Sequence, residues 1–185
     1  YGVQFLYNED KMETWDLIDK NGNKIGQTID KSMELPYGYY HLGVDLWIRN
    51  SEGKYLIQKR SMLKNRLPGK WMATGGSVLS GEDGINAVTR EAFEELGIKV
   101  DASRLTLLFK FSFNDCINEV WLLGQDIETK SIIMRMEEVS DVLWSSKDQI
   151  KEMIAKDEMI NYGTEYLDAV FSERRFDGIL IENPS

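Results

Sequence analysis

A fixed pattern of glycine, acidic and basic residues between Gly76 and Ile98 constrains this chain more than any other feature. Gly76 is followed after five residues by Glu82, and after seven more by the run Arg-Glu-Ala-Phe-Glu-Glu-Leu-Gly-Ile. The segment Ser80–Asp83 is a helix-start signal, because a small polar residue and acids favour a first helical turn. Gly97 is a stop signal, since glycine readily adopts the left-handed cap conformation. The pattern therefore predicts a loop, a helix and a second loop.

The predicted helix has one apolar and one acidic side. Apolar residues recur at spacings of three and four and are expected to be buried, namely Ile85, Val88, Ala92 and Leu96. Glu91, Glu94 and Glu95 stand at i, i+3 and i+4, so their carboxylates are expected to converge on the helix surface. Most acidic runs are only a solvated helix face. Here, Gly76, Glu82 and Arg90 stand in register with the acids, which favours a binding site.

Three neighbouring carboxylates repel one another, and hard divalent cations relieve that repulsion. Mg²⁺ and Mn²⁺ prefer carboxylate oxygens together with retained waters. The glycine pair before the helix lets backbone carbonyls approach a metal or a phosphate, which a side chain would block. We therefore predict an Mg²⁺ site, with Mn²⁺ as a substitute, at Glu91, Glu94 and Glu95, with a carbonyl of Gly75 or Gly76 as an additional ligand.

The complete pattern resembles the Nudix box, which reads Gly, five residues, Glu, seven residues, then Arg-Glu-apolar-any-Glu-Glu-any-Gly-apolar. Every defined position is filled between Gly76 and Ile98. The resemblance covers about residues 13–172. It implies a metal-dependent hydrolase that cleaves phosphoanhydrides in nucleoside diphosphate derivatives. In this family the arginine equivalent to Arg90 orients the acidic side chains or the preceding loop, and Glu82 is expected to hold that loop to the helix.

The remainder of the chain reads as strands with a few interspersed helices, which suggests an α+β sandwich. A hairpin is expected around Asn21-Gly22, between residues 15–19 and 24–28. Further strands are expected at 41–49, 54–60, 71–74, 105–113, 119–127 and 142–144, and helices at 147–156 and 164–172. The resemblance sharpens this to a mixed sheet between helices (α/β/α) with an N-terminal β-hairpin. We expect an N-terminal extension at 1–12 and one Nudix domain at 13–185.

The amino-acid composition limits the classes of molecule that the protein is expected to bind. The net charge of −9 argues against nonspecific binding to nucleic acid or to a membrane surface. No apolar run approaches membrane-spanning length. Cys116 is the only cysteine, so no internal disulfide can form and a cytoplasmic location is expected. We interpret Cys116 as a structural thiol. The expected partner is a small-molecule diphosphate. Many Nudix proteins form homodimers, a possibility that the sequence leaves open.

Segments beside the box look like the isopentenyl-diphosphate isomerase branch of Nudix proteins, notably Trp15–Asp19, Gly38–His41 and Leu56–Ser61. Those isomerases need a cysteine after the strand that enters the box, and several histidine metal ligands. Residues 74–77 contain no cysteine, and His41 is the only histidine of the chain. We therefore disfavour isomerase activity, and interpret His41 as a hydrogen-bonded structural residue.

The catalytic residues that we predict are Glu94, Glu95 and Arg90 in the box and Glu119 outside it. One carboxylate would take a proton from the attacking water. For that base outside the box we slightly favour Glu119 over Glu137 or Glu138. Arg60 and Lys70, from a basic cluster before the box, are predicted to bind substrate phosphates. A noncatalytic diphosphate sensor or interaction module is the alternative, since fold alone does not guarantee activity. The sequence does not identify which diphosphate is bound.

Overall fold

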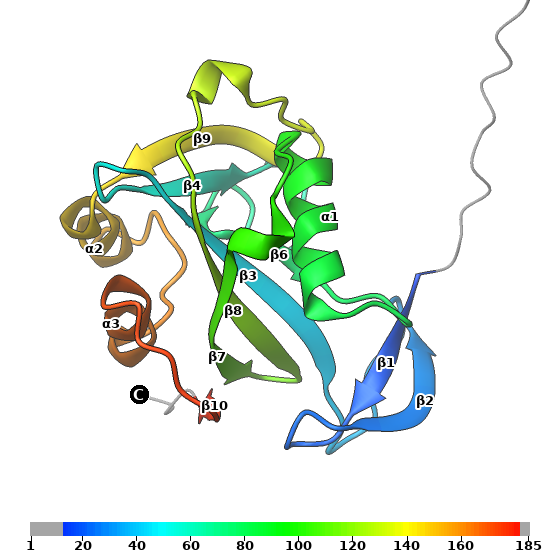
Figure 1. The fold of residues 1–185 in the computed structure, drawn as a ribbon. Coiled ribbons are helices and arrows are strands. Elements are labelled where there is room, and N and C mark those ends of the chain that lie inside the picture. The colour runs from blue at the N-terminus through cyan, green and yellow to red at the C-terminus, as the bar shows by residue number, and fades with distance from the viewer. Residues whose placement is uncertain (1–12, 182–185) are drawn as a thin grey trace, which may run out of the picture.

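The protein is described by a computed structural model that covers residues 13–181, in which a mixed β-sheet lies between helices (Figure 1). Helix α1 covers one face and helices α2 and α3 the other. The helices span α1 (Gly84–Leu96), α2 (Lys147–Ala155) and α3 (Thr164–Phe171). The eight strands of the sheet are β3 (His41–Arg49), β4 (Tyr55–Arg60), β5 (Trp71–Met72), β6 (Thr74–Ser77), β7 (Leu105–Phe113), β8 (Cys116–Gly124), β9 (Val139–Ser145) and β10 (Ile179–Ile181). This arrangement confirms the predicted α+β architecture.

Strand β3 is the centre of the sheet and carries the site. It pairs in parallel with β8 along its whole length. On its other side β3 first pairs antiparallel with β6, from Gly43 opposite Ser77 to Leu46 opposite Thr74. Its end then pairs antiparallel with β4, where Ile48 lies opposite Leu56. The glycine pair that begins the box is therefore held in the sheet rather than in an open loop.

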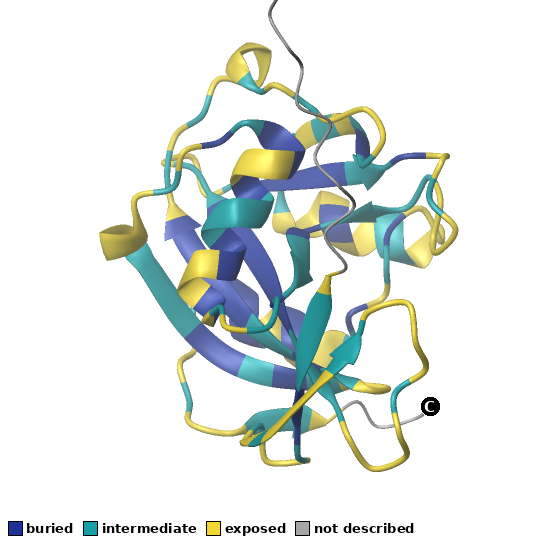
Figure 2. Cartoon of the chain, turned by 90° about the vertical axis from the view of Figure 1, so that its right-hand side faces the viewer, coloured by how far each residue is buried: buried dark blue, intermediate teal, exposed yellow. Residues whose placement is uncertain are grey.

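Alternation along β3 produces two apolar layers, as expected of a sheet that is covered on both faces. Val44, Leu46 and Ile48 pack with the buried side of α1. Trp47 faces the opposite layer with α2 and α3. Figure 2 shows the buried strands between the more exposed helices and loops. The layer on the α1 side joins the helix to β3 and to Leu56 of β4.

The N-terminal hairpin is confirmed as strands β1 (Thr14–Ile18) and β2 (Lys24–Asp30), which form a separate two-stranded sheet. The expected two-residue turn is wrong, because residues 19–23 connect the strands. The Asp19 carboxylate accepts hydrogen bonds from the backbone amides of Asn21 and Asn23, at 2.8 and 2.9 Å. These bonds stabilise a wider loop than Asn-Gly by itself would form.

Several other boundaries differ from expectation. The strand predicted at 71–74 is divided into β5 and β6, which pair with different neighbours. Strand β8 begins at Cys116, three residues before the expected start. Strand β10, parallel to β7, was not predicted. The expected extension at 1–12 lies outside the described residues. Within residues 13–181, no helix is both long and apolar enough to cross a membrane.

Candidate active site

Helix α1 begins and ends as the sequence predicts. Asp83 is the N-cap, and its carboxylate accepts a hydrogen bond from the Asn86 amide at 2.8 Å. Gly97 ends the helix with φ +66°, a conformation that favours glycine. The expected apolar side is only partly correct, because Ile85 is 39% exposed while Ala87 is buried. The helix is therefore fixed at both ends, which holds its acidic side chains in place.

Arg90 joins the loop to the helix. Its Nε and Nη2 donate to the two carboxylate oxygens of Glu82 at 2.8 and 3.0 Å. Nη2 also donates to the Ser77 carbonyl at 2.9 Å. Nη1 donates to Glu91 at 2.9 Å and to Glu94 at 3.3 Å. The hydrogen bonds to Glu82 raise the pKa of Arg90, so the guanidinium stays charged while it holds the two box acids.

The three acids of α1 differ sharply in environment. Arg90 holds the carboxylates of Glu91 and Glu94, and the Glu94 side chain is 47% exposed. Glu95 is only 5% exposed and accepts a hydrogen bond from Gln58 at 2.8 Å. Among residues 13–181, no three acidic, histidine or cysteine side chains are gathered closely enough to hold one ion. The three acids line one cavity, as their helical spacing predicts, but two separate partners hold their carboxylates.

Burial makes Glu95 and Glu91 weaker acids. Desolvation raises the pKa of Glu95 to about 8, although the hydrogen bond from Gln58 lowers it, and the nearby charge of Glu91 raises it further. Desolvation also raises the pKa of Glu91, against the favourable effect of Arg90. A carboxylate with a raised pKa is one whose charge lacks compensation in the site. A nearby cation would therefore stabilise the ionised form of Glu95.

These acids line a cavity of about 460 Å³ between α1, the end of β4 and the N-terminal hairpin. The backbone of Gly75, Gly76 and Ser77 lies on its wall. Its acidic members are Glu13, Glu91, Glu94, Glu95 and Glu138, and its basic members are Lys31, Arg60, Lys64, Arg66, Arg90 and Arg135. A cavity with mixed charges and little apolar surface suits a compact, strongly anionic ligand that binds together with cations.

The two predicted phosphate-binding residues are separated. Arg60 lies in the cavity, and its Nε donates to the Arg66 carbonyl at 2.7 Å. Lys70 does not line the cavity, because its ammonium is paired with the Asp157 carboxylate at 2.6 Å after α2. The prediction that places Lys70 beside Arg60 in the site is therefore wrong in position. Arg66, from the same basic cluster before the box, lines the cavity, and so does Arg135, which the sequence did not indicate.

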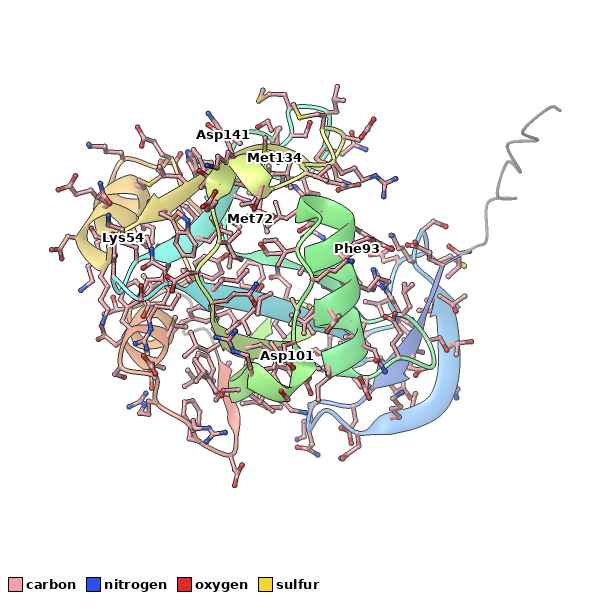
Figure 3. All side chains as sticks on the ribbon, turned by 45° about the horizontal axis from the view of Figure 1, so that its top comes forward. Lys54, Met72, Phe93, Asp101, Met134 and Asp141 are labelled. Carbon is pink, nitrogen blue, oxygen red and sulfur yellow. The ribbon has the colours of Figure 1, made fainter. Side chains whose placement is uncertain are left out.

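The structure also reverses our preference for an acid outside the box. Glu119 does not line the cavity: it lies on β8 beneath the start of α1, where its carboxylate would overlap a Cβ at Gly84, and pairs with Lys110 at 3.3 Å. Glu138 does line the cavity and is paired with Lys64 at 2.6 Å. The Arg135 amide bonds to the Glu95 carbonyl at 2.9 Å, and this brings the segment before β9 across the end of α1. Figure 3 labels Phe93 on α1 and Met134 in that segment.

The N-terminal hairpin forms a wall of the cavity, which sequence reasoning missed. The Ser80 hydroxyl donates to Asp16 at 2.6 Å, and the Ser80 amide bonds to the Thr14 carbonyl at 2.7 Å. The ring of Trp15 lines the cavity and stacks on His41, with centroids 3.9 Å apart and planes at 10°. The Trp15 Nε1 is buried and has no hydrogen-bond partner among residues 13–181. Trp15 is thus the one aromatic side chain among the described residues that line this cavity.

His41 itself is not part of the cavity lining. Burial lowers its pKa, which favours the neutral imidazole, and Nδ1 lies 3.3 Å from the Leu42 carbonyl. Cys116 lies nearby, with Sγ 3.9 Å from the His41 ring, and burial raises the pKa of its thiol. A buried thiol that resists ionisation is a poor nucleophile. The position of both residues therefore agrees with structural roles.

Comparison with known proteins identifies the family. The sequence model of the NUDIX domain matches residues 39–163 of this chain. The chain belongs to the Nudix family. As a member of it, this Nudix chain is a hydrolase of the class that acts on pyrophosphate bonds.

Three similar proteins illustrate the range of the match. An uncharacterised Nudix hydrolase of Listeria monocytogenes is 33% identical over 152 residues, which cover 82% of this Nudix chain and 90% of the relative. The crystal structure of DR0079 from Deinococcus radiodurans has a TM-score of 0.70 at 25% identity, covering 87% of this chain and 98% of that chain. An isopentenyl-diphosphate Δ-isomerase of Streptomyces coelicolor is 36% identical over 84 residues, covering 45% of this chain and 43% of the relative.

The donor set of the Nudix chain fits a divalent cation. A Cβ at Gly76 would overlap the Glu91 carboxylate, so glycine is what lets that carboxylate lie against β6 in the cavity. Mg²⁺ usually keeps several waters and is bound by one or two carboxylates together with substrate phosphates. Such a site needs no preformed set of three ligands from the protein. Glu91, Glu94 and Glu95 are therefore suitable ligands in spite of their separate hydrogen-bond partners.

Proposed function

We propose that this Nudix hydrolase cleaves the pyrophosphate bond of a nucleoside diphosphate derivative by attack of water on phosphorus, with Mg²⁺ as the cofactor and Mn²⁺ as a substitute. The observation that carries the proposal is the shared cavity, where the acids of α1, the glycine backbone of β6 and six basic side chains lie together. An acidic group of this kind would repel a diphosphate unless cations were bound between them.

Glu91, Glu94 and Glu95 would hold the metal. A bound divalent cation neutralises developing phosphate charge and lowers the pKa of a water. Arg90 keeps Glu91 and Glu94 directed to the cavity through its own hydrogen bonds. Arg60 would bind a phosphate oxygen, because guanidinium matches phosphate geometry. No comparable role is proposed for Lys70, whose ammonium is paired elsewhere.

Glu138 is our candidate for the general base outside the box. It lines the same cavity as Glu94 and Glu95, whereas Glu119 does not. A base must come within hydrogen-bond reach of the water, either directly or through one more water. Box acids remain the alternative for this proton transfer.

The ring of Trp15 is the proposed contact for the organic part of the substrate. Aromatic rings stack well on planar groups such as a nucleobase. Because Glu13, Trp15 and Lys31 line the cavity but precede the matched residues 39–163, we also propose that residues 13–185 act as one Nudix domain.

The test is hydrolysis of a panel of nucleoside diphosphate derivatives and isoprenoid diphosphates, followed by coupled phosphate release with Mg²⁺ or Mn²⁺. Turnover of one member that is lost in Glu94→Gln and in Glu95→Gln would support the proposal. Tight binding without turnover of any member would favour a noncatalytic sensor. Interconversion of isoprenoid diphosphates would favour the isomerase, which the lack of a cysteine at residues 74–77 argues against.

A further inference from the structure

Gln58 lies in the middle of β4 beneath α1 and is only 2% exposed. Its amide Nε2 donates to the Glu95 carboxylate at 2.8 Å. Its carbonyl Oε1 accepts a hydrogen bond from the Thr74 hydroxyl at 3.2 Å, and Thr74 is 1% exposed. A buried row of three polar side chains thus runs from β6 through β4 to α1. The box pattern contains neither Gln58 nor Thr74.

The direction of these bonds follows from the groups themselves. Glu95 can bind a metal only as the ionised carboxylate, which accepts hydrogen bonds and donates none, so in that form the amide nitrogen of Gln58 must face it. The amide oxygen then faces Thr74, whose hydroxyl donates. Glu95 therefore selects the orientation of Gln58, and the Thr74 hydroxyl supports it by donating to the amide oxygen. A misoriented amide would place two acceptors against each other in a buried site, which is costly.

The box acids are anchored in two different ways. Arg90, on the same helix, holds Glu91 and Glu94. Glu95 makes no ion pair with a described residue, and Gln58 is its side-chain hydrogen-bond partner from the sheet. Glu95 therefore depends for its position on neutral donors of the sheet, of which Gln58 is the side chain and the backbone of Gly75 the other.

We propose that Gln58, whose side chain is held by the hydrogen bond from Thr74, is the positioning residue that holds Glu95 for metal binding. This inference rests on the proposed function, because it takes Glu95 as a ligand of the divalent cation. Carboxylates that bind metals are themselves hydrogen-bonded, and loss of such a partner typically costs about 10- to 100-fold in metal affinity. The third acid of α1, Glu95, is thus positioned by a side chain of β4 rather than by one of the helix.

The experiment measures Mn²⁺ binding to the substrate-free protein, from the electron paramagnetic resonance signal of free Mn²⁺. Gln58→Leu removes the donor at similar size and is expected to weaken binding by about 10- to 100-fold. Thr74→Val removes only the hydroxyl that bonds the Gln58 amide oxygen and is expected to weaken binding less. Thr89→Val is the matched control, because the Thr89 hydroxyl is buried on α1 and bonds to no residue in the part of the chain that the structure describes. Its Mn²⁺ affinity is expected to equal that of the wild type.

A double-mutant cycle separates positioning from general loosening of the core. If Thr74 acts through Gln58, adding Thr74→Val to Gln58→Leu will cause no further loss of affinity. Unchanged Mn²⁺ affinity in a folded Gln58→Leu protein would overturn the inference, and so would additive losses in the double variant. If Gln58→Leu does not fold, wild-type affinity in Thr74→Val overturns it, whereas weakened binding supports it.

Failure of the function gives a different result from failure of this inference. A wild-type protein that binds Mn²⁺ but hydrolyses no diphosphate would contradict the proposed function only, and the titrations of the variants would still decide the role of Gln58. A wild-type protein that binds no Mn²⁺ would overturn both proposals.

Discussion

Arg90 and Glu82 are joined by two parallel hydrogen bonds, from Nε to Oε1 at 2.8 Å and from Nη2 to Oε2 at 3.0 Å. This fork links the middle of α1 to the loop before it. Lysine carries a point charge and cannot reproduce a planar two-donor contact. Arg90→Lys is therefore expected to lower the free energy of unfolding by about 1–3 kcal/mol, the usual range for lost hydrogen bonds to charged groups. Urea denaturation followed by circular dichroism measures this change.

Lys130→Met is a suitable control for Arg90→Lys. Lys130 pairs with Glu128 at 3.0 Å, but both side chains are largely exposed. Exposed ion pairs contribute little, so no measurable change in unfolding is expected. An equal loss of stability in both variants would show that the fork has no special role.

Two neighbouring glycines are expected to respond differently to alanine. A Cβ at Gly75 would overlap the backbone carbonyl of Val44, which cannot move without distorting β3. Gly75→Ala should therefore lower the free energy of unfolding, by about 1–3 kcal/mol as for other overpacked sites. The atoms nearest to a Cβ at Gly76 belong to the end of the Glu91 side chain, which is flexible. Gly76→Ala should keep its melting temperature but bind Mn²⁺ more weakly. The reverse pattern in melting and Mn²⁺ titration would contradict this account.

Asp45 gives the protein an unusual dependence on pH. Burial raises the pKa of Asp45 to about 6, although a hydrogen bond from the Tyr166 hydroxyl opposes the shift. The protonated form is therefore favoured by folding. Its contribution is complete below the unfolded pKa near 3.8 and is lost as the pH rises through 6. The lost contribution is at most about 3 kcal/mol, since one pKa unit corresponds to about 1.4 kcal/mol.

Asp45→Asn removes this titration and still offers an acceptor to Tyr166. The difference in unfolding free energy between Asp45→Asn and the wild type is expected to move in favour of the variant between pH 4 and pH 7. Urea denaturation at both pH values measures that difference. A constant difference would show that Asp45 does not titrate with a raised pKa.

Kinetic measurements can show which of Glu138 and Glu119 acts as the general base. Glu138 lines the cavity, so Glu138→Gln is expected to lower kcat by about 100-fold or more, as for loss of a general base. Glu119→Gln should leave kcat unchanged and reduce only stability, because Glu119 packs beneath the start of α1. A large loss of kcat in Glu119→Gln with an unaffected Glu138→Gln would restore the assignment made from sequence. Rates are measured on the best substrate of the panel.

Trp15 is expected to determine substrate affinity rather than rate. Trp15→Ala should raise KM by roughly 10-fold, corresponding to loss of about 1.5 kcal/mol of stacking. Trp15→Phe keeps an aromatic ring and should raise KM much less. Equal KM values for the wild type and Trp15→Ala would place the organic part of the substrate elsewhere. Steady-state kinetics with matched substrates that have or lack a nucleobase give the comparison.

Local signals explain the parts of the fold that were predicted well. The ends of α1 depend on the N-cap of Asp83 and the positive φ of Gly97, which are encoded within a few residues. The strands at 41–49 and 105–113 were predicted at their observed bounds, since apolar runs bounded by turns mark strands. The positions of β6 and β10 depend on pairing with distant strands, and no local pattern encodes such pairing.

The site was predictable only where one element carries it. The helix spacing placed Glu91, Glu94 and Glu95 together, but it could not show that the sheet buries Glu95 while Glu94 stays exposed. Trp15 and Gln58 come from other elements and reach the site through tertiary packing. Lys70 was predicted to bind phosphate but pairs with Asp157 outside the cavity. This pairing could not be predicted, because Asp157 lies far away in sequence. The residues of the N-terminal hairpin were correctly predicted as strands. Their sequence, however, contains no local signal that they line a cavity.

Strand β3 changes partner from β6 to β4 between Leu46 and Ile48, so the sheet branches beside the cavity. One branch carries Gly76 and leads to α1, while the other carries Gln58 and Arg60. A substrate that touches both branches would act as a crosslink across the split. Bound ligand should therefore slow hydrogen–deuterium exchange at the backbone amides of β4 and β6 together, far more than at β7 on the intact side of the sheet.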